Sequence, residues 1–165
     1  MRAYKKCMLG IFAVGAMTAA TVGYARDELV KQHYNYSEWT KGRFAEAVVV
    51  EGAKDARLIY LAGIGAEEAE GKPGEIRAPN DIAGQCAYAF EKIDLALKRN
   101  EANADDIVKM TVYLTSADFI PAFSKCRDAY FEKTGARLPA ETLLIISRLA
   151  WPDMLLEVDI NAVAR

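Results

Sequence analysis

Two strands are predicted near the end of the chain. Residues 156–164 alternate between apolar and polar side chains. Such alternation places one face of a strand on a core and leaves the other for water, a partner subunit or a ligand. Residues 138–148 begin with Leu-Pro-Ala, and Glu141 stands just before their apolar run. A Trp-Pro-Asp turn at residues 151–153 joins the two strands.

Two helices are predicted by apolar residues that recur at helical spacing. The first runs from Asp81 to about Arg99, with Asn80 as its N-cap. The second covers about residues 120–134 and ends at Gly135. The packing stripe of the first helix comprises Ile82, Cys86, Ala89, Phe90, Ile93 and Leu97, and that of the second comprises Phe119, Phe123, Cys126 and Tyr130.

The remaining apolar runs predict three more strands. Residues 44–50 and 58–61 flank a polar loop and predict a hairpin, while residues 107–114 predict a single strand. The resulting order, β-β-α-β-α-β-β, indicates an α+β fold in which one mixed sheet carries both helices on one face. The opposite face of such a sheet would be left open, so we expect oligomerisation through it.

The first 25 residues predict a cleaved signal peptide. A basic start (Arg2, Lys5, Lys6) precedes an apolar run at residues 8–20, and Gly-Tyr-Ala then predicts cleavage after Ala25. The alternative is an uncleaved membrane anchor, but the run is short for a span. The mature protein is therefore expected in the periplasm or outside the cell, with no membrane association.

The mature chain is predicted to be an acidic single domain. Removing the signal takes three of the 21 Lys and Arg residues and none of the 23 Asp and Glu residues, which leaves a net charge of −5. An acidic domain without a basic cluster argues against a nucleic-acid partner. Residues 26–43 read as an extended arm that holds His33, the one histidine, on the surface. A single histidine excludes hydrolase triads and makes a metal site improbable.

Cys86 and Cys126 remain after signal removal. In an exported protein these two could form a disulfide. Each, however, lies among apolar residues of a predicted helix, which favours the interpretation of two buried small side chains.

Five segments in order resemble the Rid (YjgF/RidA) family. The resemblance covers residues 44–165 and is carried by residues 105–114, Phe123-Ser124 with Tyr130-Phe131, residues 138–142 and residues 156–164, together with Gln85 and Leu61-Ala62-Gly63. It implies the chorismate-mutase-like fold and a homotrimer that binds small molecules in clefts between subunits. It implies no cofactor.

The resemblance also implies an activity, from which this chain departs. Active Rid proteins hydrolyse 2-imino or enamino acids to 2-oxo acids and ammonia, using an Arg that grips the substrate carboxylate and a Glu that positions water. Here Glu141 occupies the Arg position and Asn161 the Glu position, while Ser124 replaces a cleft Asn and Ala62 a cleft Ser. The expected cleft residues are Phe44, Ala62, Gly63, Ser124, Glu141, Leu143 and Asn161.

These departures disfavour the deaminase reaction. A charge pair about 4 Å apart is worth roughly 4 kcal/mol at an effective dielectric of about 20, so Glu141 would repel a carboxylate where Arg attracts it. Asn161 cannot act as a general base. We therefore expect a ligand-binding protein with lost or altered catalysis. The alternatives are a deaminase using Glu141 or Asp159 as base, and a structural ion pair of Glu141 with Arg127 or Arg148.

Overall fold

The computed structural model describes residues 28–165, and the predicted signal peptide lies outside this part of the chain. Strands and helices follow one another as the sequence order predicts, with one additional strand at the start. The elements are β1 (Val30–Tyr34), β2 (Ala47–Glu51), β3 (Arg57–Ile64), α1 (Ile82–Arg99), β4 (Ile107–Leu114), α2 (Ile120–Thr134), β5 (Ala140–Ile145) and β6 (Leu156–Ala164).

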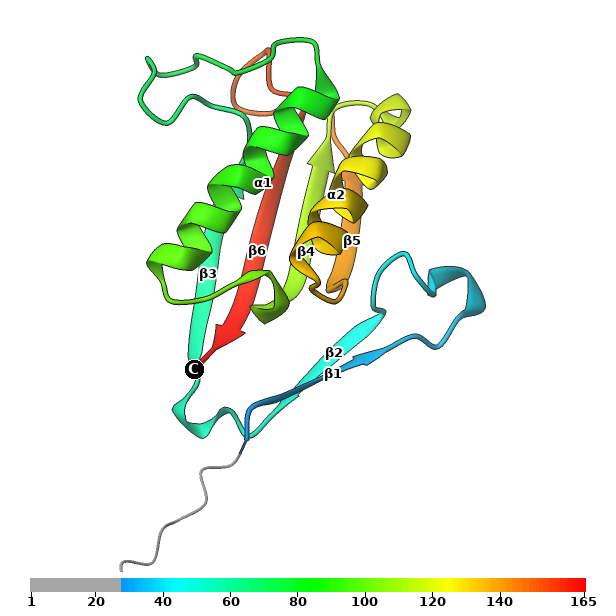
Figure 1. Ribbon diagram of the computed structural model, residues 1–165. Coiled ribbons are helices and arrows are strands. Elements are labelled where there is room, and N and C mark those ends of the chain that lie inside the picture. Colours follow the sequence, from blue (N-terminus) through cyan, green and yellow to red (C-terminus); the bar gives the residue numbers. More distant parts are fainter. Residues whose placement is uncertain (1–27) are drawn as a thin grey trace, which may run out of the picture.

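Four strands form the central sheet in the order β3-β6-β4-β5. β6 runs antiparallel to both β3 and β4, whereas β4 and β5 are parallel and are connected through α2. Figure 1 shows α1 and α2 side by side on one face of this sheet. The predicted α+β fold, a mixed sheet with both helices on one face, is confirmed.

Local chemistry sets the helix ends. Asp81, not Asn80, is the N-cap of α1, and its carboxylate accepts hydrogen bonds from the backbone N–H groups of Ala83 and Gly84 at 3.0 and 3.1 Å. Asn80 has a φ of +64°, which does not suit an N-cap residue, whose backbone is normally extended. α2 ends as predicted at Gly135, whose φ of +67° is favoured by glycine.

The predicted hairpin between residues 44–50 and 58–61 is wrong. β2 pairs with β1 to form a separate two-stranded ribbon, and β3 pairs with β6 instead. In Figure 1 the ribbon lies below the central sheet and is separate from its four strands. The expected pairing was between neighbours in the sequence, but β6, the longer strand at nine residues, provides mostly apolar partners for β3, such as Val163, Ala162 and Ile160.

The core lies between the sheet and the two helices. Its fully buried side chains include Ile93 and Leu97 of α1, Phe123 of α2, and Ile160 of β6. No helix among residues 28–165 is long and apolar enough to cross a membrane.

A disulfide joins Cys86 of α1 to Cys126 of α2, with 6.4 Å between their Cα atoms. The prediction of two separate buried thiols is therefore wrong. The apolar stripes of the two helices face each other across the layer, which brings the two side chains together.

Candidate functional site

Glu141 lies on the helix-covered face of the sheet. Its register partner on β4 is Met110, which is fully buried in the core. The Glu141 side chain is only 6% exposed, and both of its carboxylate oxygens lie 2.8 Å from Nη1 of Arg127. Glu141 is therefore held in a buried ion pair with α2.

Arg127 is shared between two carboxylates. Its Nε and Nη2 donate to Oδ1 of Asp128 at 2.9 and 2.7 Å, while Nη1 serves Glu141. Arg148, the other candidate partner of Glu141, donates to the backbone carbonyls of Leu149 and Ala150. Of the two arginines considered from the sequence, Arg127 neutralises Glu141.

Burial and the opposite charges act against each other on the pKa values of this pair. It raises the pKa of the Glu141 carboxyl, and the contact with Arg127 offsets this only in part. Burial also disfavours the charge of Arg127, but the carboxylates of Glu141 and Asp128 outweigh it and raise the pKa of the guanidinium. Together Arg127, Glu141 and Asp128 carry a net charge of −1, and the N–H donors of the guanidinium are already bonded to the two carboxylates.

Asn161 lies on the opposite, open face of the sheet. Its neighbours along β6, Ile160 and Ala162, point into the core. Its register partners are Tyr60 on β3, which is 71% exposed, and Lys109 on β4. Side chains of successive strand residues alternate between faces. One chain therefore cannot bring Asn161 and Glu141 to the same ligand.

The other expected cleft residues lie at separate places on the sheet, on α2 and near the ribbon. Leu143 follows Glu141 by two residues and packs against the core, while Ser124 precedes Arg127 by three residues on α2. Ala62 is exposed at the end of β3, next to Gly63. Phe44 packs edge-on against the ring of Trp39, 5.5 Å away.

Two charged residues of the open face were missed from the sequence. Lys109 donates from Nζ to Oγ1 of Thr142 at 2.5 Å, and burial lowers its pKa despite the opposing charge of Glu141. Glu157 lies against Gly63, since a Cβ at that glycine would stand 2.1 Å from its Oε1. Burial and nearby carboxylates raise the pKa of Glu157. The alternation along β6 already placed Glu157 on the same face as Asn161.

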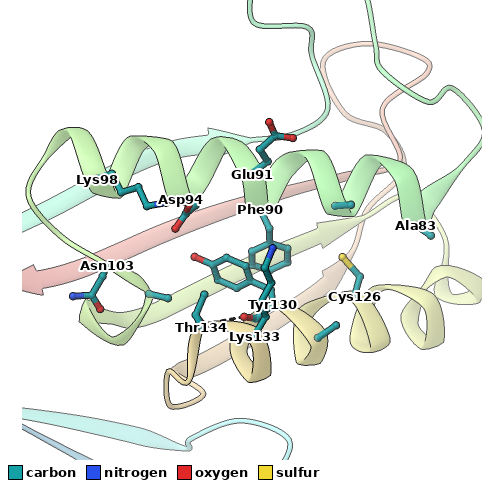
Figure 2. Close-up of a pocket in the computed structure, with 13 residues that line it drawn as sticks. Ala83, Phe90, Glu91, Asp94, Lys98, Asn103, Cys126, Tyr130, Lys133 and Thr134 are labelled. Atoms are coloured by element: carbon teal, nitrogen blue, oxygen red, sulfur yellow. Dashed lines mark hydrogen bonds and ion pairs between the residues drawn. The ribbon is translucent and has the colours of Figure 1, made fainter.

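A pocket of about 870 Å³ lies elsewhere, between α1 and α2 (Figure 2). Phe90 and Tyr130 stack there with ring centroids 4.6 Å apart. None of the expected cleft residues lines it. The described residues also contain no group of three or more His, Cys, Asp or Glu side chains that could hold a metal ion.

Comparison with known proteins agrees with this architecture. The chain is 31% identical over 118 residues to a RutC family protein of Pyrococcus abyssi, covering 72% of this chain and 84% of the relative. It is 27% identical over 94 residues to the 2-iminobutanoate/2-iminopropanoate deaminase of Escherichia coli, covering 57% and 71%. The solved structure of the Rid family protein YyfB from Yersinia pestis superposes with a TM-score of 0.65 at 23% identity, over 82% of this chain and 96% of that one.

The family assignment rests on most of the described chain. Residues 39–164 match the family described as endoribonuclease L-PSP, and this range includes the central sheet, both helices and β2. The chain therefore belongs to the endoribonuclease L-PSP family, the family of the Rid and YjgF proteins.

Proposed function

We propose that this protein is an exported Rid-family homotrimer that binds a small metabolite in clefts between subunits and does not hydrolyse 2-imino acids. The observation that carries the proposal is the buried pair of Glu141 with Arg127. At the position where the family resemblance places an anion-binding Arg, this chain holds a carboxylate, and that carboxylate occupies the nearest guanidinium.

The ion pair of Glu141 with Arg127 weakens the expected repulsion of a carboxylate ligand but does not turn it into attraction. Because Arg127 neutralises Glu141, a carboxylate ligand would not meet the full repulsion expected of an isolated Glu. The ligand would still find no free bidentate guanidinium on Arg127, since its N–H groups already donate to Glu141 and Asp128. A bidentate Arg contact is a strong source of carboxylate recognition, and its loss favours neutral or cationic ligands.

The position of Asn161 supports a site shared between subunits. Asn161 lies beside Tyr60 and Lys109 on the open face of the sheet, where a second copy of the chain can cover it, whereas Glu141 is buried on the other face. Exposed apolar side chains on the open face, such as Leu58 and Tyr60, suit coverage by another subunit. The shared cleft and the trimer implied by the resemblance are consistent with this arrangement.

The disulfide supports export. Disulfides persist in oxidising compartments and are rare where thiols are kept reduced. The Cys86–Cys126 bond therefore agrees with a signal peptide at residues 1–25 and with a periplasmic or secreted protein.

An RNA substrate is disfavoured despite the family description. Nucleic-acid affinity depends on neutralising phosphates with Lys and Arg. A mature chain with net charge −5 repels the phosphate backbone overall.

The proposal is tested by incubating the mature protein with 2-iminobutanoate and 2-iminopropanoate generated from amino acids by an oxidase. We expect ammonia release at the buffer rate, while the E. coli deaminase, run in parallel, accelerates it. In the same preparation, thermal-shift screening with amines and matched carboxylic acids should show stabilisation by amines or neutral analogues only. Acceleration of hydrolysis, or stabilisation by the acids, would contradict the proposal.

The alternative function is an enamine or imine deaminase with a replaced base. It is favoured by the activity named for the E. coli relative and by Asp159, which lies two residues from Asn161 and accepts a hydrogen bond from the Tyr113 hydroxyl at 3.1 Å. Glu141 is a poor base here because Arg127 binds both of its oxygens. If hydrolysis is observed and Asp159→Asn abolishes it while wild-type folding is kept, the alternative holds.

A further inference from the structure

The β1–β2 ribbon is attached to the body by a small polar cluster. Nζ of Lys31 on β1 lies 2.6 Å from Oδ1 of Asp106, and its side chain is only 8% exposed. Arg137 binds both oxygens of Asp105 at 3.1 and 3.0 Å and donates from Nη1 to the Lys31 carbonyl at 2.8 Å. β1 is therefore held against the segment that leads into β5.

His33 is the titratable member of this attachment. Its Nδ1 lies 2.9 Å from the carbonyl oxygen of Leu138. Because a carbonyl only accepts, Nδ1 must carry the proton, and the neutral ring then has a lone pair at Nε2. Nε2 is buried and has no hydrogen-bond partner within residues 28–165. The expectation that His33 is a solvent-exposed arm residue is wrong.

We propose that His33 is an acid-sensitive latch that holds β1 against residues 137–138 at neutral pH and releases it when the imidazole is protonated. Protonation would place a second N–H at buried Nε2, where no acceptor lies, and a positive charge near Lys31 and Arg137. Within residues 28–165, Asp105 is the carboxylate that acts on His33, and Arg137 already binds both of its oxygens. An unpaired buried charge is costly, so the protonated ring favours the released ribbon.

The direction of the pH effect follows from burial. Burial is the main cause that lowers the pKa of His33 below its ordinary value of 6.5, and Arg137 and Lys31 add to it against the opposing effects of the Leu138 carbonyl and Asp105. The released ribbon therefore binds the proton more tightly than the attached one. Attachment is complete above pH 6.5 and weakens as the pH falls below it. The attachment equilibrium falls by up to about tenfold per pH unit.

The latch lies next to the proposed cleft. The N–H of Ala45 donates to the carbonyl of Pro139 at 2.9 Å, and Ala45 forms a bridge with Ala140. Phe44 precedes this contact and Glu141 follows it in the chain. Release would therefore loosen Phe44, one of the expected cleft residues, next to the strand that holds Glu141. This consequence rests on the proposed function, whereas the latch itself does not.

The test uses untagged protein without ligand, so that its outcome is independent of the proposed function. Because His33 is the only histidine, its ring proton resonance gives its pKa directly by NMR titration. Hydrogen exchange of the Ala45 amide, which donates to the Pro139 carbonyl beside the latch, measures attachment between pH 7.5 and 5 after correction for intrinsic rates. His33→Asn is the matched control, because its amide can donate to Leu138 but does not titrate.

We expect a pKa below 6.5 and protection of the Ala45 amide that falls more than twofold from pH 7.5 to 5 in the wild type, against constant protection of β4. In the His33→Asn variant the protection of the Ala45 amide should change less than twofold over this range. A pKa of 6.5 or above, or equal pH dependence in the two proteins, would overturn the proposal. If the variant does not fold, the wild-type titration and the comparison of Ala45 with β4 still decide it.

Discussion

Replacing Glu141 alone should destabilise the protein more than replacing Glu141 and Arg127 together. The two side chains are each 6% exposed and lie 2.8 Å apart, so the pair is almost fully removed from water. Roughly 4 kcal/mol of Coulomb attraction at an effective dielectric of about 20 is opposed by a desolvation cost of several kcal/mol per ion. Burial raises the pKa of Glu141 despite Arg127, whereas the carboxylates raise the pKa of Arg127 despite burial, which agrees with an attraction close in size to its desolvation cost.

The single change Glu141→Leu leaves a buried guanidinium with only Asp128 as partner. Removing one member of a buried pair costs about 3–5 kcal/mol. Asp128 keeps its contact with Nε and Nη2, so we expect a value near the lower limit, about 3 kcal/mol. The double change Arg127→Met with Glu141→Leu removes both charges and keeps similar volume, and we expect stability equal to the wild type or about 1–4 kcal/mol higher. Asp128, with a side chain 52% exposed, remains solvated in that variant.

Urea unfolding at neutral pH, with the disulfide intact, measures these differences. All variants must be compared at one protomer concentration, because subunit association contributes to apparent stability. Arg127→Met alone is the second single variant and completes a double-mutant cycle. If Glu141→Leu lies within about 1 kcal/mol of the wild type, or if the double variant is the least stable of the four proteins, the charges are not buried as a pair and the reasoning fails.

Three further changes test the rest of the fold. Replacing Cys86 and Cys126 by Ala removes a disulfide that closes a loop of 40 residues, which should lower the free energy of unfolding in urea by about 3–4 kcal/mol. A thiol assay should find no free thiol at these positions in the wild type. Equal stability with and without the bond would contradict the linked helices. Tyr130→Phe removes a buried hydroxyl that has no hydrogen-bond partner among the described residues. Thermal unfolding should therefore show a stability that is unchanged or higher by up to about 1 kcal/mol. A clear loss of stability would reveal a hydrogen-bond partner that the structure does not show. Gly135→Ala should cost about 1 kcal/mol because φ is +67° in otherwise open space, and a neutral result would mean that the helix end rearranges.

Local patterns predicted the helices and strands but not all of their partners. α2 ends at Gly135 because one glycine supplies the left-handed backbone, and that signal lies in the sequence itself. The pairing of β2 with β1 depends instead on distant anchors, since Lys31 bonds to Asp106 and Arg137 to the Lys31 carbonyl. Tertiary contacts of this kind leave no periodic signal. The link from Cys86 to Cys126 is similar, because helical spacing shows that each faces the core and not that they face each other.

In the candidate site, too, local patterns predicted the face of each strand residue but not which residues from different strands lie together. Alternation along β6 places Asn161 and Glu157 on one face, but their relation to Glu141 requires the register of β5 through β4. Family resemblance aligned the positions and could not supply that register.

One signal for the Glu141 ion pair was nevertheless present in the sequence. The buried residues of α2 are Phe123, Arg127 and Phe131, which recur every four residues along one helix face. A charged residue in the middle of an apolar stripe is rarely buried without a partner. The β4–α2–β5 connection packs that face of α2 over the sheet, and the first acidic residue of the returning strand is Glu141. The position of Arg127 therefore predicts the ion pair more directly than that of Glu141, because helical spacing alone shows that Arg127 is buried and must have a carboxylate partner.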